Sequence, residues 1–188
     1  MLIRTALAAV TLLATLGACS ENAASHLSEA EYQRLADESG HPIEDVKREF
    51  ADYKTTENTI LLHKEDEGLK AARAEAQRTL PKFLQKLRAK APGTYSIKFP
   101  LRVSGKVEHI WLQVDRVNGA IFHGRLANKP VGAGSEYRMG QSMQVAKHNV
   151  EDWMIRVPEG IYGGYTARHA ATKMPPAERA ELERMLLD

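Results

Sequence analysis

The sequence predicts an α+β fold, with helices at the N-terminus, then a small antiparallel sheet, then a short C-terminal helix. Two patterns indicate this class. Apolar residues recur at helical spacing up to about residue 90, and from residue 94 onward they alternate in short runs separated by turn residues. Helices first and strands afterwards are typical of α+β proteins. We expect the sheet to curl into a half-barrel, as short meandering strands commonly do.

The first two helices are predicted to form a hairpin. Ser28 and Glu31 form a capping box at the start of the first helix, which should end near Gly40. Pro42 suits the first turn of the second helix. The apolar stripe of that helix comprises Ile43, Val46, Phe50 and Tyr53.

The same region matches the spacing of a helix-turn-helix DNA-binding signature at Ala36, Gly40 and Val46. The alternative is an ordinary helical hairpin whose turn needs glycine. Residues 20–93 hold 14 acidic and 12 basic residues, so the pair lacks the positive charge that phosphate binding requires. We therefore expect no nucleic-acid partner.

The longest helix is predicted from Glu65 to Ala89, with acidic residues at its start and basic residues at its end. Pro81 should kink this helix or split it in two. Its apolar face comprises Leu69, Ala72, Ala76, Leu80, Phe83, Leu84 and Leu87.

Two strands follow, and they are the clearest in the chain. Residues 95–103 alternate with period two, and so do Ile110, Leu112 and Val114, which leaves His109, Trp111 and Gln113 on the opposite face.

Asn118-Gly119 predicts a hairpin leading into a third strand at 121–126. A tight turn there would place Arg116 opposite Ala120-Ile121. The remaining strand candidates are 141–145, 150–157 and 162–168. Pro175-Pro176 begins a closing helix whose apolar stripe is Leu182, Met185 and Leu186.

The composition excludes several classes of function. Lys and Arg number 26 against 24 for Asp and Glu, a net charge of +2. This balance is too even to indicate nucleic acid, an anionic membrane surface or an acidic substrate through bulk charge. The single cysteine, Cys19, excludes an intramolecular disulfide and a cysteine-based zinc cluster.

The N-terminus has the pattern of an export signal. Arg4 precedes an uncharged run from Ala6 to Ala18. As a helix this run would rise about 20 Å, short of a roughly 30 Å hydrocarbon core, so it indicates a signal peptide rather than a membrane span. The alternatives at its end are a plain secretory signal and a lipoprotein signal.

The run ends in Leu16-Gly17-Ala18-Cys19, which resembles the lipobox of bacterial lipoproteins. The resemblance implies that Cys19 is lipidated and becomes the first residue of the mature chain. Ser20 follows, where an Asp would resemble an inner-membrane retention signal. We therefore expect a lipid anchor in the outer membrane, with the protein facing the periplasm.

We expect five segments along the chain. They are a signal peptide (1–18), a tether (19–27), a helical hairpin with its connection (28–64), an α+β domain (65–174) and a C-terminal helix (175–188).

A family resemblance covers residues from about 65 to 169. Five stretches carry it: 71–84 (AARAEAQRTLPKFL), 108–111 (EHIW), 124–131 (GRLANKPV), 150–154 (VEDWM) and 163–168 (GGYTAR). Together they resemble the bacterial domain-of-unknown-function 2314 family, which includes the YegJ-like proteins. The resemblance implies a compact α+β domain and supplies no catalytic residue. The first 64 and the last 19 residues lie outside it.

One set of polar and aromatic residues is a candidate binding surface, because Trp, Tyr and Arg dominate binding hot spots. The alternative is structural: Asp152 would pair with an Arg, the tryptophan rings would fill the barrel, and Gly163-Gly164 would permit a bend. The candidate residues are His109, Trp111, Arg125, Asn128, Asp152, Trp153, Tyr165 and Arg168.

Other chemistry has weaker support. His109, His123, His148 and His169 lie in the sheet region, but the chain has no His-x-His or His-Glu-x-x-His pair, which favours hydrogen-bonded or solvated histidines over a zinc site. Gly132 to Ser135 lacks the second glycine of a nucleophile elbow and has no P-loop lysine. We expect no metal and no cofactor.

The sequence therefore favours a non-enzymatic envelope lipoprotein that acts as a binding or structural module. Its partner would be the membrane, through the lipid, with an envelope protein or a small ligand. Two alternatives remain. One is a periplasm-facing, hydrolase-like enzyme that uses Asp152, His109 and Arg125. The other is a module that inhibits or neutralises a toxin.

Overall fold

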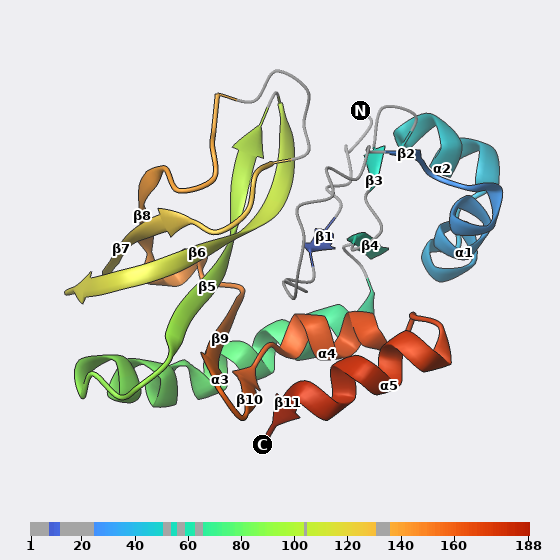
Figure 1. Ribbon diagram of the computed structural model, residues 1–188. Coiled ribbons are helices and arrows are strands. Elements are labelled where there is room, and N and C mark those ends of the chain that lie inside the picture. The colour runs from blue at the N-terminus through green and yellow to red at the C-terminus, as the bar shows by residue number, and fades with distance from the viewer. Residues whose placement is uncertain are drawn as a thin grey trace.

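The computed structural model describes residues 8–11, 25–50, 54–55, 59–62, 66–103, 105–130 and 136–188 (Figure 1). A seven-stranded sheet with the order β11-β10-β9-β5-β6-β7-β8 forms its centre. Neighbouring strands are antiparallel except β10 and β11, which are parallel. The predicted α+β class is confirmed. Cys19, Tyr53 and Gly132 to Ser135 lie outside the described residues.

The predicted helical hairpin is present as α1 (Glu29–Ser39) and α2 (Ile43–Phe50). Ser28 accepts a hydrogen bond from the Glu31 amide at 3.3 Å, and the Glu31 carboxylate accepts one from the Ser28 amide at 2.7 Å. Gly40 ends α1 in the left-handed conformation, with φ of 69°. Two-residue strands β2 (Ser25–His26) and β3 (Lys54–Thr55) pair beside the hairpin. Its small core comprises Leu27, Leu35, Ala36 and Val46.

The long helix α3 (Glu67–Arg88) continues through Pro81, so of the two predicted effects of this proline, a kink or a split, the split is wrong. Proline removes its own N–H and therefore only one hydrogen bond of the helix. On either side of it, Leu80 and Phe83 are buried against the sheet, and this packing holds the two halves in one helix.

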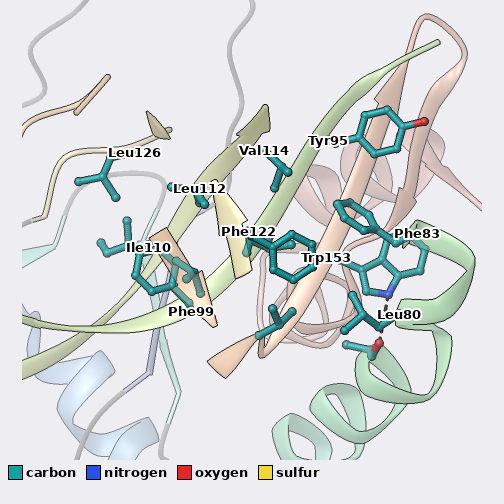
Figure 2. Close-up of a cluster of buried hydrophobic side chains, with 14 of the residues drawn as sticks. Leu80, Phe83, Tyr95, Phe99, Ile110, Leu112, Val114, Phe122, Leu126 and Trp153 are labelled. Carbon is teal, nitrogen blue, oxygen red and sulfur yellow. Dashed lines mark hydrogen bonds between the residues drawn. The ribbon is translucent and has the colours of Figure 1, made fainter. Parts of the chain in front are cut away.

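The main core lies between α3 and one face of the sheet (Figure 2). The Phe83 ring is at its centre, with its centroid 5.4 Å from that of Tyr95, 6.2 Å from Phe122 and 5.6 Å from Trp153. The Trp153 indole N–H donates to Thr79 Oγ1 and to the Ala76 carbonyl, both at 3.1 Å. The core therefore includes polar anchors on α3.

The strands agree with the predicted alternation. β5 (Thr94–Val103) buries Tyr95, Ile97 and Phe99 in the main core, and β6 (Lys106–Asn118) buries Ile110 and Leu112 there. The other strands of the sheet are β7 (Ile121–Leu126), β8 (Ser142–Ala146), β9 (Asp152–Val157), β10 (Gly160–Gly163) and β11 (Leu186–Leu187).

The hairpin between β6 and β7 differs from the prediction in its register. Asn118 pairs with Ile121, so the two turn residues are Gly119 and Ala120. With this turn Arg116 lies opposite His123 rather than opposite Ala120-Ile121. Farther from the turn, a β-bulge between Val114 and Arg116 shifts the register again, so that Val114 lies opposite Gly124. A bulge inserts an extra residue into one strand and so shifts every pair beyond it.

The predicted strand at 162–168 is wrong after Gly163. Gly163 and Gly164 have φ of 77° and 66°, and the chain turns there into helix α4 (Tyr165–Ala171). Helix α5 (Pro176–Met185) follows and buries Leu182, as expected. Leu186 belongs to β11 rather than to the helical stripe, because the chain becomes extended there and pairs with β10.

The two faces of the sheet have different covers. α3 covers the apolar face, whereas α4 packs against both α3 and β9 and brings Thr166 to the face that carries Lys98 and Asp152. Beside α4, β1 (Ala8–Thr11) pairs with β4 (Thr59–Leu62) and contacts both α4 and β6 (Figure 1). Within the described ranges, no helix has both the length and the apolar character needed to cross a bilayer.

Candidate functional site

Asp152, at the start of β9, is the centre of a buried polar network. Its carboxylate accepts hydrogen bonds from the amides of Trp153 and Tyr165, at 2.8 and 3.1 Å. It also accepts from the amide and the hydroxyl of Thr166, at 2.8 and 2.7 Å. Tyr165 and Thr166 lie in the first turn of α4, which has no capping side chain of its own, whereas Trp153 follows Asp152 on β9. Asp152 therefore caps α4 from a neighbouring strand and offsets the positive end of its dipole.

Lys98 is the buried counter-charge of Asp152. In the sheet it lies between Asp152 on β9 and Trp111 on β6, so all three share one face. Its side chain is 1% exposed, with Nζ 3.5 Å from Thr166 Oγ1 and 5.8 Å from the centroid of the Trp111 ring. Burial lowers the pKa of Lys98 to about 8, against the opposing effect of Asp152. Burial raises the pKa of Asp152, although Thr166 and Lys98 act in the other direction.

A second group lies where this face reaches solvent. His109 Nδ1 contacts Glu151 Oε2, and Arg73 Nη2 lies 3.3 Å from Glu151 Oε1. Burial lowers the pKa of His109, with Glu151 opposing. Burial acts to raise the pKa of Glu151, but the hydrogen bond from His109 and the Arg73 charge hold it below the usual value. Neutral His109 therefore donates from Nδ1 to an ionised Glu151.

A third group joins α4 to the beginning of α3. Asp66 caps α3 by accepting from the Leu69 amide at 2.8 Å on Oδ1, and His169 Nε2 lies 2.7 Å from the same oxygen. Lys173 lies 3.0 Å from Glu38 of α1 and 3.9 Å from Asp66. Burial acts to raise the pKa of Asp66, but the Leu69 amide, His169 and Lys173 together hold it below its usual value.

The structure places half of the predicted site residues inside the protein. Trp111, Asp152, Trp153 and His109 are buried, so they do not form an exposed recognition face. The structural alternative, in which these residues only support the fold, is correct in part. Trp153 fills the core as expected, but Asp152 interacts with Lys98 and with backbone amides rather than with an arginine.

The other four candidates are half-buried or exposed. Asn128 Oδ1 accepts from the Trp111 amide at 2.9 Å, and the Tyr165 ring lies 5.8 Å from that of Trp153. Arg168 donates to the carbonyls of Gly163 and Leu187 and so joins β10 to β11. Arg125 is exposed, 3.5 Å from Asp115.

The enzyme hypothesis needs Asp152, His109 and Arg125 in one cleft, and the sheet keeps them apart. Asp152 and Arg125 lie on β9 and β7, with β5 and β6 between them. Three strand spacings of about 4.8 Å separate those strands. His109 pairs across the sheet with Pro100, and its side chain contacts Glu151 and Arg73. The three side chains therefore make no common site.

Sequence analysis missed four members of the network: Arg73, Lys98, Glu151 and Thr166. Lys98 stands between apolar residues on an alternating strand, a pattern that normally places lysine in solvent. A usable signal existed near Gly164, because a helix that starts after glycine without a local capping residue needs a partner from elsewhere. The described residues hold no group of three or more His, Cys, Asp or Glu that could bind a metal ion.

Comparison with known proteins decides the family. The model of DUF2314, described as an uncharacterized protein conserved in bacteria, matches residues 66–186. The chain belongs to this family. The match continues beyond residue 169, so the expectation that the last 19 residues lie outside the resemblance is wrong. It includes α5 and Leu186 of β11, which packs the C-terminus against β10.

A curated relative agrees with this membership. The Escherichia coli (strain K12) protein named "Uncharacterized protein YegJ" is 31% identical over 121 residues, which are 64% of this chain and 76% of the relative. No solved structure matches the chain. Three of the stretches that carry the DUF2314 resemblance, 108–111, 150–154 and 163–168, meet at the buried network around Asp152.

Proposed function

We propose that this DUF2314 protein is a bacterial envelope lipoprotein, anchored through acyl chains on Cys19, whose domain is a non-enzymatic binding or structural module. The observation that carries the proposal is the sequence Leu16-Gly17-Ala18-Cys19, in which the chain's single cysteine ends an uncharged run. Each buried methylene of an acyl chain contributes about 0.8 kcal/mol, so two or three chains anchor a protein durably. Ser20 favours the outer membrane, facing the periplasm.

The geometry of the domain supports a non-enzymatic role. The carboxylate of Asp152 is occupied by four internal donors, and the guanidinium of Arg168 by two backbone carbonyls. Such groups stabilise the fold and are not open to a substrate. The geometry gives no support to the hydrolase alternative, because Asp152, His109 and Arg125 do not converge.

Membrane fractionation with labelled palmitate tests the anchor. Cys19→Ser should remove both the label and the membrane association, whereas Ser20→Ala, one residue away, should keep both. Ser20→Asp should keep the label and move the protein to the inner membrane. A Cys19→Ser protein that still fractionates with membranes, or a wild-type protein without label, contradicts the proposal.

A further inference from the structure

β1 occupies a site on the domain as an added strand. Residues 8–11 pair with β4 in an antiparallel register, from Ala8 opposite Leu62 to Thr11 opposite Thr59. In the described part of the chain, β4 has no other strand partner. β1 also contacts β6 and α4, so it lies over the sheet face that carries Lys98 and Trp111.

The strand β4 is fixed in place by its own packing. Leu62 is fully buried and packs in a cluster with Leu69 of α3 and with Ala167 and Ala170 of α4. Buried backbone N–H and C=O groups need hydrogen-bond partners. Without β1, the backbone N–H and C=O groups along the edge of β4 would have no strand partner. The packing of Leu62 would hold β4 in place and so keep these groups from turning toward water. An unpaired strand edge is a template for another strand.

The proposed function predicts that β1 is absent from the mature protein, because residues 8–11 belong to the expected signal peptide of residues 1–18. We infer that the β1 site is then a docking site for an extended, apolar peptide segment of a partner protein, which pairs with Thr59–Leu62. This inference rests on the proposed function and specifies the partner of the binding module. The recognition mode is strand addition, in which backbone hydrogen bonds supply affinity.

The present occupant indicates which side chains the site accepts. Ala8, Ala9, Val10 and Thr11 are small or β-branched and uncharged. A partner segment of about four residues with small or β-branched side chains matches this pattern. The register with β4 favours a peptide over an acyl chain, since an acyl chain has no backbone groups to pair.

The test uses the full chain with Cys19→Ser, so that it does not depend on lipidation or cleavage. A fluorescent peptide of residues 6–13, with lysines added at both ends for solubility, is the probe. In the parent chain, β1 competes at high effective concentration. In a variant with Ala9→Pro and Val10→Pro, β1 can no longer pair, because proline lacks the N–H that a ladder needs. The domain itself is unchanged in this variant.

We expect the double-proline chain to bind the peptide at least tenfold more tightly than the parent chain does, by fluorescence anisotropy. The same prolines placed at Ala14 and Thr15, outside β1, should leave binding as weak as in the parent. A peptide that carries the two prolines itself should not bind the double-proline chain. Absence of peptide binding to a folded double-proline chain, or binding of a fluorescent fatty acid in place of the peptide, overturns the inference. The palmitate test of the anchor is a separate experiment on the chain that keeps Cys19, so neither peptide-binding result changes its outcome.

Discussion

The capping of α4 by Asp152 gives the sharpest test of the fold. Asp152→Asn keeps the shape of the side chain but replaces one oxygen by an NH2 group, which must face backbone amides that also donate. It also removes the stronger of the two negative charges that act on the buried Lys98 cation, and leaves Glu151. Removing one of two interacting buried charges costs about 3–5 kcal/mol of folding free energy.

Urea unfolding at pH 7 measures this loss, and Asp115→Asn is the matched control. Asp115 pairs with Arg125 at 3.5 Å on an exposed part of the sheet, where an ion pair contributes about 0–1 kcal/mol. The combination of Asp152→Asn with Lys98→Met should recover more than about 1 kcal/mol of the Asp152→Asn loss, because neither charge is then left alone. If Asp152→Asn and Asp115→Asn lose the same small amount, the network does not hold α4 and the reasoning is refuted.

Two further predictions concern buried groups. Lys98 has a pKa of about 8 in the folded protein against 10.5 in the unfolded chain. Between about pH 8 and pH 10.5 the unfolded chain binds more protons than the folded protein, so the free energy of unfolding should rise with pH by about 3 kcal/mol. Below about pH 8 the cost of burying the charged Lys98 is fully present. Urea unfolding from pH 7 to 10.5 should show this rise in the wild type relative to Lys98→Met, and parallel curves would contradict it. Gly68→Ala should destabilise by about 1–3 kcal/mol through overpacking, because its Cβ would lie 2.1 Å from His169 Cε1. Thermal unfolding measures it, with exposed Ala71→Gly as the helix-propensity reference, and a stabilised Gly68→Ala would contradict the packing.

Local signals in the sequence were sufficient for much of the fold. The capping box at Ser28 and Glu31 involves residues three positions apart, and the alternation of 95–103 follows from one strand whose apolar residues all face the main core. In both cases the interactions that decide the structure lie within the segment itself. The same is true of the apolar face of α3, apart from Pro81, whose disruptive tendency is overcome by packing on both sides.

The candidate site depended on interactions between distant segments, which a single sequence does not reveal. The segment after Gly164 is helical because a carboxylate from β9 satisfies its first amides, so its own pattern was misleading. Lys98 is buried although alternation assigns its face to solvent, and Thr166 of α4 and Trp111 of β6 lie beside its side chain. The bulge between Val114 and Arg116 likewise changes partners across the β6–β7 hairpin, and the glycine beside it, Gly124, lies on the opposite strand.

The strand order has a consequence for how the chain acquires its structure. β5, β6, β7 and β8 are consecutive in sequence and in the sheet, whereas β9 pairs with β5 on the other side after the whole meander. Loop closure makes such a distant pairing slower than the formation of neighbouring hairpins. Trp111 belongs to the meander and Trp153 to β9. Stopped-flow fluorescence of Trp153→Phe and Trp111→Phe variants should therefore resolve an early step at Trp111 from a later one at Trp153, and identical kinetics would show that both sides of β5 assemble together.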